Sequence, residues 1–171
     1  MATNYTILDL DGCIAHDAWR IPEIAWHHPD PFRRYDRYHQ LSPWDACGNE
    51  DLFRDRPERI LIFTSRPVIY RTLTEEWLKR TELRYAHLLM RNNDDHRPSA
   101  ALKRAQLGWL AEYGVRLSEI VCAYDDRPEI ISMYEAAGLR AELRALHEVS
   151  AYLNPLTGIN HADGTLSAQT A

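Results

Sequence analysis

Short apolar runs alternate with amphipathic stretches along most of this sequence, and this alternation constrains the fold more than any other feature. The runs fall at residues 5–8, 60–63, 86–90, 120–124 and 139–143. Runs of this length are typical of strands that are buried on both faces of a sheet. A repeated strand–helix order implies right-handed crossovers and a parallel sheet with helices on both faces. The sequence therefore predicts an α/β, Rossmann-like fold of three layers around a central, mainly parallel sheet.

Three helices are expected between these strands. Residues 69–80 are expected to form the first helix, with one face made of Ile69, Leu73, Trp77 and Leu78. Pro98 and Pro128 can each occupy the first turn of a helix, where the missing backbone donor costs nothing. Gly138 is expected to end the last helix. Three large aromatic side chains are expected in the core: Trp77, Trp109 and Tyr134.

Composition indicates one globular domain. The chain has 171 residues, of which 45% are hydrophobic and 26% are charged, as in ordinary soluble proteins. No run reaches the roughly 20 apolar residues of a membrane helix, and the early first strand leaves no room for a signal peptide. We therefore expect a cytoplasmic protein that does not bind membranes. Residues 1–153 should form the domain, with a cap-like insertion at 18–55 and a flexible tail at 154–171.

Charge and cysteine usage narrow the function classes. The net charge is −5, which argues against a protein that coats long stretches of nucleic acid, because such binding needs a basic face. The three cysteines, Cys13, Cys47 and Cys122, lie far apart in the sequence. No two of them have the spacing of zinc ligands, so free thiols in a reducing compartment are expected.

Polar clusters follow three of the predicted strands. The first strand leads into Asp9 and Asp11, the second into residues 64–66 (Thr-Ser-Arg), and the fourth into residues 125–127 (Asp-Asp-Arg). Ligands of a parallel sheet bind beyond the carboxyl ends of its strands, so these clusters should meet at one edge. Lys103, one of only two lysines in the chain, is expected to join them from a helix.

Converging carboxylates need a counter-charge. If Asp9, Asp125 and Asp126 lie about 4 Å apart, each pair costs on the order of 4 kcal/mol at an effective dielectric of 20. Three pairs then cost about 12 kcal/mol, more than a small domain tolerates. Carboxylate oxygens are ligands that Mg²⁺ prefers. We therefore expect a magnesium site formed by Asp9, Asp11, Asp125 and Asp126, and leave open which of the last two touches the ion.

The pair Asp9 and Asp11 suits covalent phosphoryl transfer. A carboxylate held on a metal can attack phosphorus when the metal also screens the phosphate charge. A second acid two residues on can protonate the leaving oxygen and later take a proton from water. Thr64 and Lys103 would hold the phosphoryl oxygens and cancel developing charge. These four residues are the predicted catalytic set, with Asp9 as the nucleophile.

Four motifs in chain order are Asp9-Leu10-Asp11-Gly12, Thr64, Lys103 and Asp125-Asp126. They resemble the four motifs of the haloacid dehalogenase (HAD) superfamily in its phosphatase branch, over about residues 5–143. Asp11 is the phosphatase-type residue, because dehalogenases lack this acid. The chain is also similar to the 3′-phosphatase domain of bacteriophage polynucleotide kinase/phosphatases. That similarity rests on Thr74-x-x-Trp77-Leu78, Met90-Arg91, Asp95-x-Arg97, Lys103, Asp125-Asp126-Arg127, Met133 and Gly138.

The second resemblance implies substrate contacts by arginines. Arg20 follows Asp11 by nine residues and Arg66 follows Thr64 by two, as in that family. Ser65 and Arg127 are further candidates for binding the substrate. Surface ion pairs are the alternative role for Arg20 and Arg66. The chain departs from the family pattern at Cys13, where threonine is usual, and in the longer segment 18–40. It contains no P-loop motif, so no kinase half is expected.

Other residues admit two interpretations. His27 and His28 could suggest a metal site, but adjacent side chains point in different directions, so a loop is favoured. The run 32–38 (Phe-Arg-Arg-Tyr-Asp-Arg-Tyr) could stack bases and bind phosphates, or form an amphipathic lid helix.

The sequence thus predicts a Mg²⁺-dependent phosphomonoesterase for nucleotides or phosphorylated nucleic-acid ends, with polynucleotide 3′-phosphatase as the leading hypothesis. A phosphatase of free nucleoside monophosphates is the alternative, and a catalytically silent binding module is a remote one. Base, sugar and strand preference, and the oligomeric state, are left open.

Overall fold

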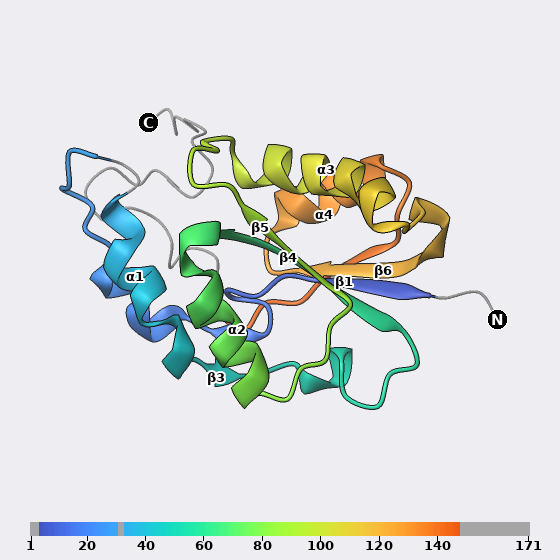
Figure 1. The fold of residues 1–171 in the computed structure, drawn as a ribbon, viewed down its shortest axis with the longest axis horizontal. Coiled ribbons are helices and arrows are strands. Elements are labelled where there is room, and N and C mark those ends of the chain that lie inside the picture. The colour runs from blue at the N-terminus through green and yellow to red at the C-terminus, as the bar shows by residue number, and fades with distance from the viewer. Residues whose placement is uncertain (1–3, 31–32, 148–171) are drawn as a thin grey trace, which may run out of the picture.

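The computed structural model describes residues 4–30 and 33–147, and the predicted tail at 154–171 lies outside them. Its centre is a five-stranded sheet of order β5-β4-β1-β6-β7 (Figure 1). Every neighbouring pair in this sheet is parallel. The strands are β1 (Tyr5–Leu8), β4 (Arg59–Pro67), β5 (His87–Arg91), β6 (Ile120–Asp125) and β7 (Ala141–Leu143). The predicted parallel α/β sheet is confirmed.

Helices cover both faces of this sheet. In Figure 1, α3 (Ser99–Trp109) and α4 (Pro128–Ala136) lie above the sheet and α2 (Arg71–Arg80) lies below it. Two separate apolar cores result. One packs Trp77 and Leu78 of α2 under the sheet, and the other packs Leu107, Ile130 and Tyr134 on the opposite face. The predicted three-layer architecture is therefore confirmed. Two short 3₁₀ helices, η6 (Leu110–Tyr113) and η7 (Leu117–Glu119), lead from α3 into β6.

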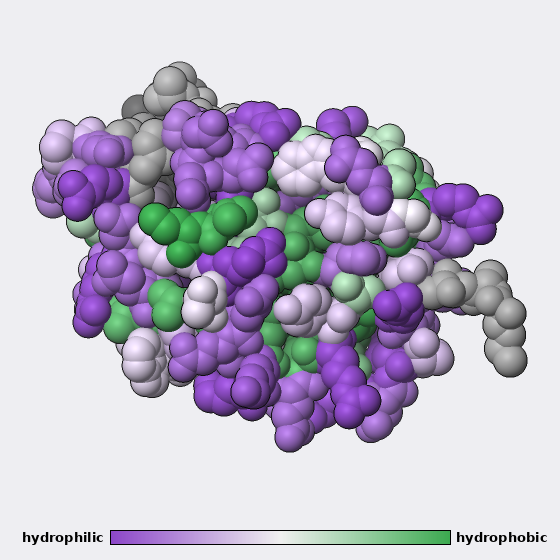
Figure 2. Space-filling view, viewed as in Figure 1, coloured by the Kyte–Doolittle hydropathy of each residue, from purple (hydrophilic) through white to green (hydrophobic). Residues whose placement is uncertain are grey.

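The start of α2 differs from the prediction. Ile69 was expected on the buried face of a helix over 69–80, but it lies in a 3₁₀ turn, η5 (Val68–Tyr70), and is 69% exposed. Pro67 continues β4 in an extended conformation, with φ −63° and ψ 146°, so the helix begins only at Arg71. Figure 2 shows an apolar patch near this end of α2 on a largely hydrophilic face. Trp109, expected in the core, is only half-buried.

The segment predicted as an insertion lies, in its described residues 18–30 and 33–55, beside the carboxyl ends of the strands (Figure 1). Its base is a two-stranded antiparallel ladder in which Ala15 pairs with Cys47 and His16 with Ala46. Ile21, Ile24 and Tyr38 form a small core of its own. Its elements are β2 (Ala15–His16), η1 (Ala18–Glu23), η2 (Arg33–Tyr35), α1 (Asp36–Gln40), η3 (Ser42–Trp44), β3 (Ala46–Cys47) and η4 (Glu50–Leu52).

Membrane insertion was not expected, and the described part of the chain has no helix of the length and apolar character that a bilayer span needs.

Candidate active site

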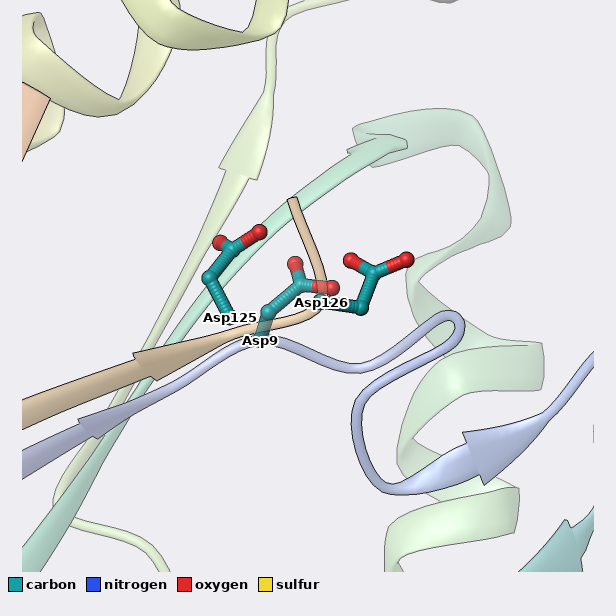
Figure 3. A group of neighbouring side chains, drawn as sticks. All are labelled: Asp9, Asp125 and Asp126. Atoms are coloured by element: carbon teal, nitrogen blue, oxygen red, sulfur yellow. The ribbon is translucent and has the colours of Figure 1, made fainter. Parts of the chain in front are cut away.

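Three buried carboxylates meet at the carboxyl edge of the sheet. Asp9 follows β1 directly, Asp125 is the last residue of β6, and Asp126 comes next. β1 and β6 are neighbours with Leu8 opposite Tyr124, so the two strand ends bring these side chains together. Figure 3 shows Asp9 between the other two carboxylates. One oxygen of each residue lies within 4.8 Å of the others. The predicted convergence of these three acids is therefore present.

Lys103 provides a cation for this cluster. Its ammonium, brought from α3, lies 2.5 Å from Asp9 Oδ1 and also bonds Asp125 Oδ2. The lysine side chain is 3% exposed. Burial opposes its charge, yet Asp125 and Asp9 raise the pKa of Lys103 above its ordinary value. One lysine therefore faces three carboxylates, and the ionised cluster carries an excess of negative charge.

Two of the three carboxylates, those of Asp9 and Asp126, have pKa values raised by their surroundings. Burial raises the pKa of Asp9 to about 7, with Asp125 adding to the effect and Lys103 opposing it. Burial, Asp125 and Asp9 raise the pKa of Asp126 well above its ordinary value. An all-oxygen donor set of this kind suits Mg²⁺, which would neutralise the excess charge. Asp9, Asp125 and Asp126 are therefore the residues that could hold the metal.

Asp11 lies outside this group. Asp11 was predicted to be a metal ligand, but among the described residues the carboxylate group contains only the other three acids. Its carboxylate instead accepts hydrogen bonds from Arg66 Nε at 3.1 and 3.0 Å, from Arg66 Nη2 and from Arg20 Nη2. Burial opposes ionisation, but Arg66 and Arg20 hold the pKa of Asp11 well below its ordinary value. Asp11 is therefore ionised.

Arg20 and Arg66 are fully buried, with side chains 0% exposed. The surface ion pairs considered as an alternative role are thus excluded. Arg20 comes from η1 of the insertion and Arg66 from β4, so both sides of the site contribute one guanidinium to Asp11. Their predicted contact with a substrate phosphate would compete with these bonds.

Asp45 is a polar residue of the site that the sequence analysis missed. Its carboxylate binds Arg20 in a bidentate manner, at 2.8 Å from Nε to Oδ1 and 2.7 Å from Nη2 to Oδ2. Arg66 Nη2 lies 3.4 Å from the same Oδ2. Asp45 is 0% exposed. The sequence offers only an indirect signal for Asp45. Two arginines placed beside the single acid Asp11 need a second anion to balance their charge.

The other predicted site residues, Thr64, Ser65 and Arg127, all form hydrogen bonds within the protein. Thr64 is 1% exposed, and its Oγ1 accepts a hydrogen bond from the Arg66 backbone at 3.2 Å. Ser65 and Ser99 are joined by a hydroxyl–hydroxyl bond of 3.0 Å. The Arg127 backbone N–H donates to Asp125 Oδ1 at 3.2 Å, while its guanidinium binds Glu129. Arg127 thus helps to fix Asp125 as well as lining the edge of the site.

The aromatic residues of the insertion pack mainly against one another. The ring of His39 lies 5.1 Å from that of Tyr38 and 5.0 Å from that of Tyr70, and Tyr35 lies 6.0 Å from Tyr38. Burial lowers the pKa of His39 to about 3, so this ring is neutral. Of the two interpretations of residues 32–38, packing as a cover fits the described residues better than an open stacking surface. Residue 32 is outside them.

The histidine pair has no metal-site geometry. His28 Nδ1 accepts a hydrogen bond of 3.1 Å from the Asp30 backbone in an exposed turn. Neither His27 nor His28 belongs to a group of metal-binding side chains in the part of the chain that the structure covers. The loop interpretation of this pair fits the structure.

Comparisons with known proteins identify the fold. No protein-family model matches the chain, and no curated protein matches it. Among solved structures, a chain of the Pnkp1/Rnl/Hen1 RNA repair complex is similar, with a TM-score of 0.61 and 19% identity over 83% of this chain. This chain spans only 42% of that one.

Two smaller proteins are similar over most of their own length. A predicted phosphatase from Clostridium acetobutylicum has a TM-score of 0.61 and 12% identity, with 82% of this chain and 84% of that chain covered. The haloacid dehalogenase-like protein SP0104 from Streptococcus pneumoniae has a TM-score of 0.57 and 10% identity, with 82% and 83% covered. The HAD-type fold that the motifs predicted is thereby confirmed.

Proposed function

We propose that this chain is a Mg²⁺-dependent phosphomonoesterase that forms an aspartyl-phosphate on Asp9. The observation that carries the proposal is the buried group of Asp9, Asp125 and Asp126 around the ammonium of Lys103. Structural similarity to proteins described as phosphatases supports the same reaction class. A catalytically silent module would have no need to bury three acids at a ligand-binding edge, at the cost that like charges impose.

The proposed reaction has two steps. An oxygen of Asp9 attacks the phosphorus, and the bond from phosphorus to the ester oxygen breaks. The leaving oxygen takes a proton from the acid form of Asp11, which is the minor form of a carboxylate that Arg66 and Arg20 hold ionised. Water then attacks the phosphorus of the aspartyl-phosphate, and Asp11 takes the proton of that water. Free phosphate and the intact Asp9 carboxylate result. Bound Mg²⁺ would screen the phosphate charge during both attacks.

Lys103 and Thr64 are proposed to hold the phosphoryl group. The Lys103 ammonium already contacts the attacking carboxylate, so it is within reach of an oxygen transferred to Asp9. Thr64 is the last residue of the continuous buried run 60–64 in the neighbouring strand β4. Charged and polar donors fixed before the reaction stabilise charge that develops in the transition state. Ser65 and Arg127 remain proposed contacts for the rest of the substrate.

A phosphorylated nucleic-acid end, with a 3′-phosphate as the leading choice, is the proposed substrate. The motif pattern with Arg20, Arg66 and Arg127 supports it, as does the similarity to a chain of an RNA repair complex. A free nucleoside monophosphate is the second candidate. The acidic net charge of −5 and the ordered insertion beside the site favour it.

One assay separates these candidates. Phosphate release with Mg²⁺ is measured on 3′-phosphorylated oligonucleotides, 3′-mononucleotides and 5′-mononucleotides, beside a small aryl phosphate. A polynucleotide 3′-phosphatase should have its highest kcat/KM on the oligonucleotide. Preference for either mononucleotide would select the second candidate. No release from any of the four by the folded protein would contradict the phosphatase assignment.

Asp11→Asn is expected to lose activity while keeping its metal. General acid–base groups contribute roughly 10²–10⁴-fold to rates, so kcat should fall within that range. Because Asp11 lies outside the carboxylate group, Mg²⁺ should still raise the melting temperature as in the wild type. Unchanged turnover would remove the acid–base role, and loss of the Mg²⁺ effect would make Asp11 a ligand after all.

A further inference from the structure

The buried charges beside Asp11 form a closed set. Arg20 and Arg66 carry two positive charges, and Asp11 and Asp45 carry two negative ones. Three of these side chains are 0% exposed, and Asp11 is 18% exposed. Buried charges are stable only when they are paired and hydrogen-bonded. Each of these four groups therefore depends on the others for its position.

Within this set, Asp45 is the residue best fixed to the rest of the fold. Its carboxylate also accepts the indole N–H of Trp19 at 3.0 Å. Its backbone carbonyl accepts hydrogen bonds from Trp77 Nε1 at 2.9 Å and from Arg80 Nη2 at 2.5 Å, both on α2. Asp45 thus joins the insertion to the face of the domain that carries α2. Among the described residues, no hydrogen bond links Asp45 to the three-carboxylate group or to Lys103.

The arginines in turn determine where the Asp11 carboxylate lies. Arg66 approaches Asp11 through Nε and Nη2, and Arg20 through Nη2. Asp45 accepts hydrogen bonds from both Nε and Nη2 of Arg20, and Nη1 of Arg20 donates to the Tyr38 carbonyl at 3.0 Å. With every donor group of Arg20 engaged, this side chain has one orientation. Through its bond to Asp11, this orientation restrains where the Asp11 carboxylate lies beside the three-carboxylate group.

We propose that Asp45 is a positioning residue of the active site, which acts on catalysis through Arg20, Arg66 and Asp11. This inference rests on the proposed phosphatase function and adds a residue to it. It makes the insertion a structural part of the catalytic centre as well as a cover near it. In this proposal Asp45 itself contacts neither the substrate nor the metal.

Asp45→Asn tests this role with little change in shape. The amide keeps one acceptor for Arg20 but loses the charge and the bidentate geometry. Misplacing a reacting group by about 1 Å can cost about 10²-fold in rate, so kcat should fall roughly 10- to 100-fold. KM and the Mg²⁺ concentration for half-maximal activity should stay unchanged. The matched control is Asp36→Asn, another insertion carboxylate, which bonds Tyr70 and Arg33 at the surface; it should keep the wild-type kcat.

A second pair of variants addresses the case in which Asp45→Asn does not fold. Arg80→Ala removes one anchor of the Asp45 backbone from an exposed position on α2. It should lower kcat in the same direction, by less, with KM unchanged. Lys79→Ala, its exposed neighbour on the same helix, is the control and should have no effect.

The outcomes separate three cases. If the wild type releases no phosphate, the proposed function fails and the role of Asp45 in it fails too. If the wild type is active and both Asp45→Asn and Arg80→Ala retain its kcat, the positioning role is wrong. A change in KM at constant kcat would also overturn it, because that result would mean that the released arginines act on the substrate phosphate directly.

Discussion

Asp9→Asn is expected to reduce phosphate release by about a thousandfold or more, because it removes the proposed nucleophile and with it the proposed covalent route. The amide can occupy the same space between Asp125 and Asp126 (Figure 3), but it cannot form the aspartyl-phosphate. The measurement is single-turnover phosphate release with Mg²⁺ on a 3′-phosphorylated oligonucleotide. Rapid quenching of the wild type in acid should also trap labelled phosphate on the protein, and the variant should trap none.

The same variant should be no less stable than the wild type when Mg²⁺ is absent. Burial raises the pKa of Asp9 from 3.8 to about 7, so the folded state binds a proton that the unfolded state releases between these values. Such a group makes folding less favourable as the pH rises through this window. Asparagine removes that cost, so the advantage of the variant should be complete above pH 7 and absent below about pH 4.

Activity and stability thus change in opposite directions, which separates a lost nucleophile from a misfolded protein. Thermal melting at pH 5 and pH 8, with EDTA present, makes the comparison. Equal phosphate release by the wild type and the variant would remove Asp9 from the mechanism. A variant that melts well below the wild type at pH 8 would contradict the electrostatic description of the carboxylate group.

Lys103→Met is expected to lose both activity and stability. The substitution removes the ammonium that bonds Asp9 and Asp125 and keeps an apolar side chain of similar length. Breaking a buried ion pair by removing one partner costs about 3–5 kcal/mol. If Lys103 faces the phosphoryl group as proposed, losing this preorganised charge should lower kcat by about 10²–10³-fold. Melting with EDTA present and steady-state kinetics measure the two effects.

The pH dependence of this destabilisation tests its cause. Without Lys103 the negative charge of the carboxylate group is not compensated, so the pKa values of Asp9 and Asp126 rise and the folded state binds more protons than the unfolded state. Stability must then increase as the pH falls from 8 toward 5, and Mg²⁺ should restore part of it at pH 8. Lys79→Met is the matched control, since Lys79 is the only other lysine in the chain and is exposed. If both lysine variants melt alike, the proposed pairing of Lys103 is wrong.

The sequence predicted those parts of the site that follow from strand ends. β1 has the predicted bounds, and Asp125 ends β6 one residue beyond the predicted run. The apolar runs are set by burial on both faces of the sheet, so their ends are visible as changes in residue type. Parallel pairing then brings residues more than 100 positions apart, Asp9 and Asp125, to one edge.

The parts that could not be predicted depend on where the insertion packs. Residues 18–55 have no period that fixes their register against the sheet, so neither Asp45 nor its bond to Arg20 could be identified from pattern alone. Family resemblance named Arg20 and Arg66 as residues of the site but not their partners. Ile69 was placed on a helix because helical spacing includes it, yet the extended Pro67 delays the first turn of α2.

The central position of β1 in the sheet has a consequence for synthesis and folding of the chain. Its two neighbours are β4 and β6, so the strand that is made first cannot complete its hydrogen bonds until residue 125 has been made. Contacts of such large sequence separation slow folding, and unpaired strand edges meanwhile favour aggregation. The nascent chain therefore carries Asp9 at the end of a half-paired strand until β6 has been made. Asp9, Lys103, Asp125 and Asp126 can therefore come together only after residue 126 has been made.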